Sequence, residues 1–151
     1  MKVAIGSDHA GTGLRQFVRE WLEQKEAEVV DFGPHEAGSV DYPDYAALVS
    51  RSILNQEAER GVLVCGSGMG MSMAANRFEG IRAALCREPL TAEFARSHNN
   101  ANVLVLGERF TGTALAEAIL QAWWETPFEG GCHARRVAKI EQQKPEREDH
   151  V

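Results

Sequence analysis

The residues whose types and spacing could do chemistry are concentrated in the segment Cys65-Gly66-Ser67-Gly68-Met69-Gly70, which follows a compact apolar run. Backbone N–H groups of alternating glycines can converge on one point, and a helix that follows adds its positive dipole end. Met71 stands where the dinucleotide-binding fingerprint has glycine, and no Lys-Ser or Lys-Thr pair follows, so the segment is not a Walker loop. It therefore indicates an anion site, with a tight strand-to-helix turn as the alternative.

Cys65 opens this segment, where the N-terminus of a helix stabilises the thiolate form of a cysteine. A thiolate can attack a carbon atom or remove a proton from one. The alternative is a buried cysteine that only packs, which is the common case for free thiols. That alternative is our interpretation of Cys86, which follows the fourth expected strand.

Polar residues also stand near the ends of other expected elements. Asp8 and His9 end the first strand, where a carboxylate can orient a sugar hydroxyl and an imidazole can donate to a phosphate; a helix N-cap is the alternative. His98 and Asn99 end the fourth helix, and by themselves they indicate a helix C-terminus. Tyr42 precedes a helix and either lines a pocket or packs in a turn.

The basic residues gather late in the chain. Arg109 follows the fifth expected strand, and His133 and Arg136 lie at the start of the last helix. Arginine suits phosphate because its planar guanidinium donates hydrogen bonds in pairs. For Arg135 and Lys139 a solvated helix face is the better interpretation.

The elements that must position these residues alternate along the chain. Apolar runs predict strands over residues 2–6, 28–32, 61–65, 81–85 and 102–106. Helical patterns predict helices over residues 14–22, 43–55, 67–78, 89–97, 112–126 and 133–143. This alternation predicts a three-layer, doubly wound, Rossmann-like α/β fold, with a five-stranded parallel sheet covered by helices on both faces. The strand order does not follow from the sequence.

Residues 1–143 are predicted to form one domain, followed by a polar, frayed tail over residues 144–151. Open parallel sheets bind ligands at the carboxyl ends of their strands. We therefore expect the polar residues that follow strands one, three and five to meet at that edge, together with His98 and Asn99.

Composition excludes several classes of function. The 151 residues are 44% hydrophobic and 25% charged, which is enough to build a core and excludes disorder over the whole chain. The formal net charge of −6 disfavours nucleic acid as a partner. No apolar run approaches the roughly 20 residues of a membrane span. The 3 cysteines and a short apolar N-terminal stretch indicate free thiols in the cytoplasm.

Together these segments resemble the type B ribose-5-phosphate isomerase family, which includes related galactose- and allose-phosphate isomerases. The resemblance covers nearly the whole chain. The motifs that carry it are Gly6-Ser-Asp-His-Ala-Gly11, Asp41-Tyr-Pro43, Cys65-Gly-Ser-Gly-Met-Gly70, Ala74-Ala-Asn-Arg77, Gly80-Ile-Arg-Ala83, His98-Asn-Asn-Ala-Asn102, Gly107-Glu-Arg109 and His133-Ala-Arg-Arg136.

The resemblance implies an aldose–ketose isomerisation by proton transfer through a cis-enediolate, in the pentose phosphate pathway, with no metal and no cofactor. It makes Cys65 the base, and Ser67 the residue that moves a proton between the sugar oxygens. It makes His98 the residue that opens the furanose ring and Asp8 the one that holds ring hydroxyls. The amides around Gly66, Gly68 and Gly70 would stabilise the enediolate oxygen.

The resemblance also implies how the substrate is bound. His9, Arg109, His133 and Arg136 would grip the phosphate, and Asn99 and Tyr42 would line the sugar site. The site of this family lies between two subunits, so the resemblance implies a homodimer or a homotetramer with a shared site. Because this chain keeps Cys65 together with the phosphate residues, a homo-oligomer suits it better than two unlike chains.

One position departs from the family pattern. Cys132 stands where the family commonly has arginine, directly before His133. The lost cation should weaken phosphate binding, because a hydrogen bond to a charged group contributes about 1.5–3 kcal/mol. Arg135 would compensate, or the substrate would differ from ribose 5-phosphate. The alternatives are a hexose 6-phosphate or tetrose phosphate isomerase and a sugar-phosphate-binding module without activity.

Overall fold

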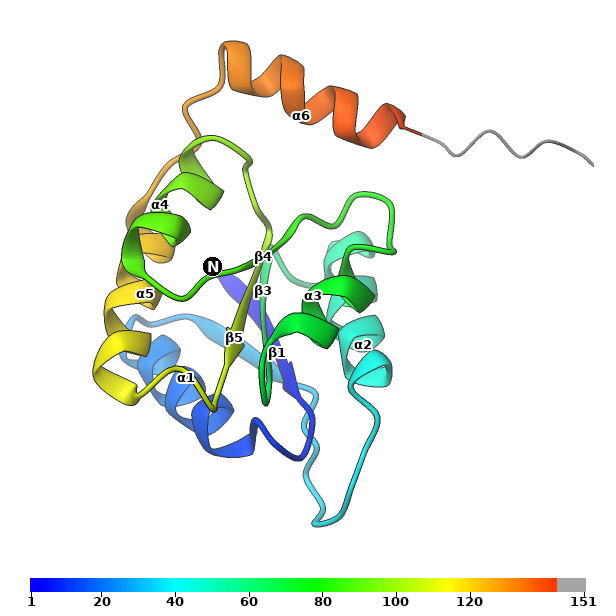
Figure 1. Ribbon diagram of the computed structural model, residues 1–151, viewed down its shortest axis with the longest axis vertical. Coiled ribbons are helices and arrows are strands. Elements are labelled where there is room, and N and C mark those ends of the chain that lie inside the picture. The colour runs from blue at the N-terminus through cyan, green and yellow to red at the C-terminus, as the bar shows by residue number, and fades with distance from the viewer. Residues whose placement is uncertain (144–151) are drawn as a thin grey trace, which may run out of the picture.

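The computed structural model describes residues 1–143, so the expected tail over residues 144–151 lies outside the described residues. Five strands alternate with the first five helices, and a sixth helix follows (Figure 1). The strands are β1 (Lys2–Ser7), β2 (Glu28–Asp31), β3 (Arg60–Cys65), β4 (Ala83–Leu85) and β5 (Val103–Gly107). The helices are α1 (Thr12–Gln24), α2 (Tyr42–Leu54), α3 (Met69–Ala75), α4 (Pro89–Ser97), α5 (Thr113–Glu125) and α6 (Cys132–Gln142).

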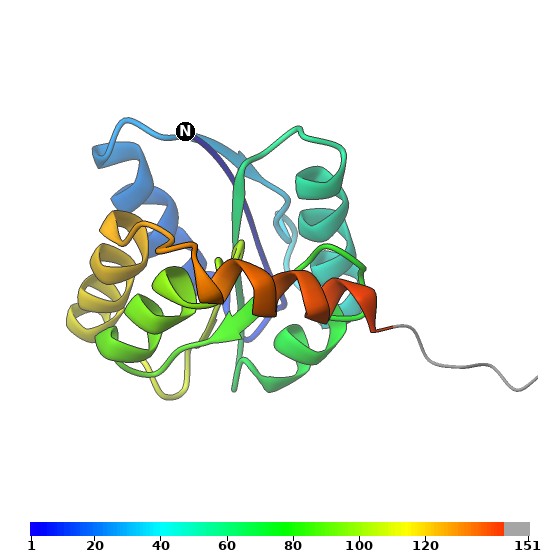
Figure 2. The same ribbon diagram turned by 90° about the horizontal axis from the view of Figure 1, so that it is seen from above.

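The strands form one parallel sheet in the order β2-β1-β3-β5-β4. Helices α1, α4 and α5 cover one face and α2 and α3 cover the other, as the view from above shows (Figure 2). The predicted doubly wound, three-layer architecture is therefore confirmed. The strand order, which the sequence did not reveal, turns out to decide where the site forms.

The core consists of two apolar layers, one on each face of the sheet. Along β3, Val62 and Val64 belong to the layer under α1, α4 and α5, whereas Leu63 and Cys65 belong to the layer under α2 and α3. This alternation follows from the two-residue period of a strand. Because both faces are covered, the central strands are apolar throughout. Cys65 is thus the last residue of β3 and belongs to the core layer under α2 and α3.

Two predicted elements are shorter than the sequence suggested. The helix expected over residues 67–78 is α3, which ends at Ala75, and the strand expected over residues 81–85 pairs only from Ala83. Two asparagine amides explain both differences. Asn76 bonds both backbone groups of Ala83, at 2.8 and 2.9 Å, and Asn102 accepts from Arg82 N–H at 2.8 Å. These side chains satisfy backbone groups that a longer helix or strand would use.

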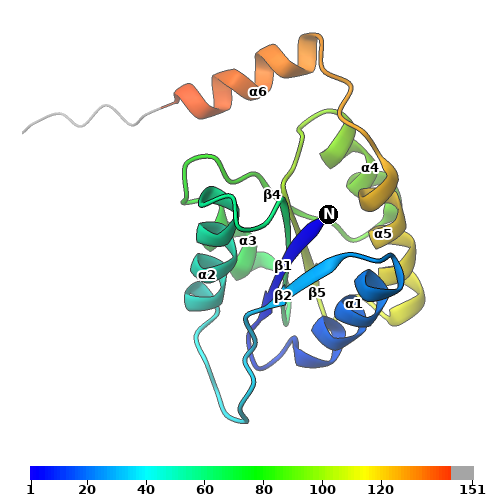
Figure 3. The same cartoon turned by 180° about the vertical axis from the view of Figure 1, so that it is seen from behind.

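Helix α6 stands away from the two helical layers and crosses over one end of the sheet (Figures 1 and 3). None of its residues is buried, and the Ile140 side chain is 53% exposed. Its end is held by Glu141, which accepts from Arg82 at 2.6 Å and from the Gly80 N–H at 3.0 Å. Helix α6 therefore presents an uncovered face.

In the described part of the chain, no helix has the length and apolar character needed to cross a membrane.

The packing of β5 gives a first prediction. Leu104 is fully buried between β3 and β4, so Leu104→Ala should lower the free energy of unfolding by about 2–5 kcal/mol. Urea denaturation followed by circular dichroism measures this. Leu48→Ala, on the exposed side of α2, is the control and should change stability by only about 0.5 kcal/mol. Equal losses in both variants would contradict the assignment of the core.

Candidate active site

The sheet order creates a crevice between the ends of β1 and β3. From β1 the chain leaves toward β2 on one side, and from β3 it leaves toward β4 on the other. Ligands of open parallel sheets bind where connections diverge in this way. The Asp8 N–H donates to the Val64 carbonyl at 3.2 Å, which holds the end of β1 against the end of β3. Asp8 and Cys65 are therefore neighbours at one edge.

The loop after β3 wraps around the Cys65 sulfur. The Gly68 N–H donates to Sγ at 3.1 Å, and the Met69 N–H donates to Ser67 Oγ at 3.2 Å. Gly68 has φ +80°, a left-handed conformation that glycine adopts without strain. Helix α3 begins only at Met69, so the N–H group that donates to the sulfur belongs to the loop and not to the helix.

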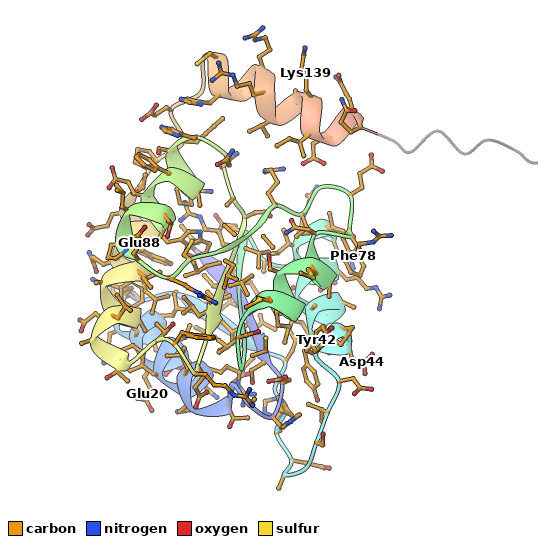
Figure 4. All side chains as sticks on the ribbon, viewed as in Figure 1. Glu20, Tyr42, Asp44, Phe78, Glu88 and Lys139 are labelled. Atoms are coloured by element: carbon orange, nitrogen blue, oxygen red, sulfur yellow. The ribbon has the colours of Figure 1, made fainter. Side chains whose placement is uncertain are left out.

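A cavity of about 220 Å³ opens above this loop. Its lining consists of Asp8, His9, Ala10, Tyr42, Cys65, Gly66, Ser67, Gly70 and Arg109. Tyr42 reaches it from the start of α2, where Figure 4 labels it. A Cβ at Gly70 would lie 2.6 Å from the Tyr42 ring, and one at Gly66 would lie 3.2 Å from Arg109 Nε. These two glycines thus leave room for the side chains of the cavity wall.

The polar side chains of the cavity are held by backbone groups. Asp8 is buried, and its Oδ1 accepts from the Ala10 N–H at 2.9 Å. The His9 Nδ1 lies 3.2 Å from both backbone polar atoms of Val40. Helix α1 has Gly11 as its N-cap and no side-chain cap, so neither Asp8 nor His9 caps this helix. Both side chains are therefore fixed at the cavity rather than used by α1.

The three cysteines differ in their surroundings. Cys65 is 4% exposed, yet its sulfur borders the cavity. Cys86 is fully buried, and burial raises the pKa of its thiol to about 11. Cys132 is exposed at the start of α6. The interpretation of Cys86 as a packing residue agrees with this environment.

His98 and Asn99 lie at the opposite edge of the sheet, so the expectation that they join the carboxyl ends of the strands is wrong. Helix α4 follows β4 and must run back antiparallel to it before β5 can start. The Asn99 carbonyl accepts from Arg82 Nε at 3.1 Å, and Arg82 directly precedes β4. His98 and Asn99 are therefore at the amino edge.

The last helix brings further predicted residues to that amino edge. The His133 ring stacks on the His98 ring with centroids 4.3 Å apart, and Phe94 stacks on the other side of His98 at 4.8 Å. Arg136 follows one turn later on α6. The predicted site residues of one chain thus form two separate groups, with Cys65, Asp8, His9, Tyr42, Ser67 and Arg109 at one edge of the sheet and His98, Asn99, His133 and Arg136 at the other.

Arg82 organises the amino edge, and the sequence analysis gave it no role. Its guanidinium donates to the Asn99 carbonyl at 3.1 Å, to the Asn100 carbonyl at 3.0 Å and to Glu141 at 2.6 Å. It therefore ties the loop that carries His98 to the end of α6. The signal available in the sequence was the motif Gly80-Ile-Arg-Ala83, which carries the family resemblance but assigns no role to the arginine.

The chain is similar to known proteins over most of its length. The sequence matches the model of the family described as Ribose/Galactose Isomerase over residues 3–140. It is 42% identical over 139 residues to ribose-5-phosphate isomerase B of Escherichia coli, which covers 92% of this chain and 93% of that protein. It is 40% identical over 141 residues to D-erythrulose-4-phosphate isomerase of Pectobacterium atrosepticum, covering 93% of each chain.

A solved structure is similar over the same length. The crystal structure of a ribose 5-phosphate isomerase from Thermotoga maritima superposes with a TM-score of 0.91 at 54% sequence identity, covering 94% of this chain and 98% of that one. Fold and relatives together define an α/β enzyme of the aldose–ketose isomerase class. The chain belongs to the ribose/galactose isomerase family, which confirms the resemblance seen in the sequence.

The Arg82 contacts give a second prediction. Arg82→Lys removes the planar guanidinium that reaches two carbonyls and Glu141 together, so stability should fall by about 1–3 kcal/mol. Hydrogen exchange should accelerate at residues 98–102 and in α6, and stay unchanged at residues 8–10. Arg51→Lys, an exposed arginine beside Phe78, is the control. An unchanged rate of hydrogen exchange in α6 would contradict the connection that Arg82 makes between the loop of His98 and α6.

The buried thiol gives a third prediction. The pKa of Cys86 rises from 9.0 to about 11, so the folded state favours the neutral thiol. Its contribution to stability is complete below pH 9 and is lost as the pH rises toward 11. Iodoacetamide at pH 8 should leave Cys86 unmodified in the folded protein and modify it in urea, as peptide mass spectrometry measures. Rapid modification in the folded state would contradict the burial.

Proposed function

We propose that this protein interconverts ribose 5-phosphate and ribulose 5-phosphate in sites that two copies of the chain share. The observation that carries the proposal is the Cys65 sulfur at the cavity, held by the Gly68 N–H and flanked by Asp8 and Ser67. The E. coli relative is named for this activity, and the solved Thermotoga structure is described with it.

In the proposed reaction, Cys65 takes the proton from C2 of the open-chain aldose and returns it to C1. The intermediate is a cis-enediolate, whose negative oxygen accepts hydrogen bonds from the loop amides at Gly66 and Gly70, beside the Gly68 N–H that holds the Cys65 sulfur. Such donors contribute about 2.7–4 kcal/mol each when aimed at a developing oxyanion. Ser67 moves a proton from O2 to O1, so that all atoms balance and no oxidant is needed.

The remaining predicted residues bind and open the sugar. Asp8 holds ring hydroxyls, Tyr42 and Asn99 line the sugar, and His98 opens the furanose ring. His9 and Arg109 grip the phosphate from the carboxyl edge of one chain. His133 and Arg136 grip it from the amino edge of a second copy.

Two features support a homodimer with shared sites. Ligand sites usually enclose about 300–1,000 Å³, and the cavity in one chain is only about 220 Å³. Helix α6 buries none of its own residues and carries His133 and Arg136 away from the cavity. A second copy that places its amino edge against this cavity supplies the missing wall and covers α6. The reducing cytoplasm suits an enzyme that depends on a free thiol.

A tetrose phosphate is the second candidate substrate. Cys132 stands where the family commonly has arginine, and the Pectobacterium relative is named a D-erythrulose-4-phosphate isomerase. A panel of pentose, hexose and tetrose phosphates, compared by kcat/KM, separates these candidates. Binding of all three without turnover would identify a sugar-phosphate-binding module instead.

The fourth prediction tests the base. Cys65→Ala should lower kcat by about 10³-fold or more and leave the circular dichroism spectrum unchanged, because the proton acceptor is lost. Ribulose 5-phosphate formation measures the rate. Cys86→Ala is the matched control and should retain activity. Turnover of Cys65→Ala at the rate of the unaltered protein would refute the role of Cys65.

The fifth prediction tests the shared site. Cys65→Ala and His98→Asn, each inactive alone, should regain about one quarter of the original activity after they are mixed, unfolded and refolded. Half of the dimers are then mixed, and each mixed dimer holds one site with both functional side chains. No recovery would show that each site uses a single chain.

A further inference from the structure

We propose that His98, Glu129 and His133 form a binding site for a divalent transition metal ion, Zn²⁺ above all, at the amino edge of the sheet. One imidazole or carboxylate atom from each residue lies within 4.8 Å of the other two. In the proposed enzyme, these residues belong to the amino edge that one chain presents to the cavity of a second copy. Occupied by Zn²⁺, it inhibits the isomerase, an effect that rests on the proposed function.

The backbone holds the three residues together. The Glu129 N–H donates to the Ser97 carbonyl at 3.0 Å, which anchors the segment after α5 beside the end of α4. The His133 N–H donates to the Gly130 carbonyl at 3.0 Å, so a tight turn separates Glu129 from His133. These backbone contacts therefore hold the segments that carry His98, Glu129 and His133 side by side.

The donor set suits zinc. Two imidazoles and one carboxylate, with a fourth position left to water, are a common set of zinc ligands. An ion pair explains only part of the cluster, since His133 Nε2 lies 3.4 Å from the Glu129 carboxylate, whereas the His98 ring stacks on two rings and has no hydrogen bond within residues 1–143. A metal ion gives the His98 ring a polar partner.

Binding requires a small rearrangement. Zinc ligands lie about 2.0–2.2 Å from the metal, so the three atoms must draw closer than they are now. The His98 and His133 rings are nearly parallel, with 9° between their planes, and both must turn about χ2 to point at one ion. This torsion has a broad energy well, and both side chains are only half-buried. The stack then opens toward Glu129.

The consequence for activity follows from the two histidines. In the proposed enzyme His98 opens the sugar ring and His133 binds phosphate, and neither can do so while it ligates a metal. Zinc should therefore compete with the sugar phosphate. Glu129 has no part in the proposed reaction, so Glu129→Gln removes a metal ligand and leaves the uninhibited turnover unchanged.

Calorimetric titration with ZnCl₂ of the full-length protein and its Glu129→Gln variant tests the site. We expect one ion per chain in the unaltered protein and binding weaker by about tenfold or more in Glu129→Gln, since even outer partners of metal ligands contribute 10–100-fold. Glu57→Gln, an exposed glutamate on the loop after α2, is the matched control and should bind as the unaltered protein does. Equal affinity in all three proteins would overturn the site.

Two further measurements separate the outcomes. Co²⁺ bound at this site should give visible absorption without the near-ultraviolet band of a thiolate ligand, and such a band would show that Cys65 or Cys132 binds the metal and overturn the proposal. Zinc should inhibit isomerisation less in Glu129→Gln than in Glu57→Gln, and equal inhibition would overturn the competition. If the protein lacks isomerase activity, the proposed function fails while calorimetry still decides the metal site.

Discussion

The divergence of the chain between β1 and β3 is the constraint on which the rest of the structure depends. Because the two strands are adjacent and their connections leave in opposite directions, the space above their ends stays open among residues 1–143. The loops that border this space must approach closely. A Cβ at Gly107 would lie only 2.5 Å from the Ser67 carbonyl oxygen, so the end of β5 needs glycine there. The same convergence brings the Arg109 guanidinium beside Gly66 and completes the cavity wall.

The parallel sheet also explains why the predicted site residues of one chain lie in two groups at opposite edges. Each helix that follows a strand returns to the amino edge, so α4 delivers His98 and Asn99 far along the strands from Cys65. Arg82 then connects that loop to α6, which buries none of its own residues in the described structure. In the proposed assembly, a second copy brings residues of both edges into one site and covers α6. The same amino edge holds the two histidines and the glutamate that we assign to a metal ion.

Much of this could be predicted from the sequence, because period-two and period-3.6 apolar patterns report directly on burial. All five strands and six helices were found, and the residues after β1, β3 and β5 meet at the cavity. The strand order could not be predicted, since the apolar sequence of a buried strand does not indicate which strands pair with it. The predicted position of His98 was wrong because α4 runs antiparallel to β4 and therefore ends at the amino edge of the sheet. Asn76 and Arg82 were missed because most of their partners are backbone groups, and Glu141, the side-chain partner of Arg82, lies 59 residues further along the chain.

The central claim is that proton transfer at carbon takes place beside the Cys65 sulfur. Its most direct test is the deuterium content of the two sugar phosphates after many turnovers in D₂O, determined by NMR. We expect deuterium at C2 of the aldose and at C1 of the ketose. Alkylation of Cys65 should abolish the incorporation of deuterium at both carbons. Deuterium that still enters C2 and C1 at the original rate after Cys65 is alkylated would contradict proton transfer at this sulfur.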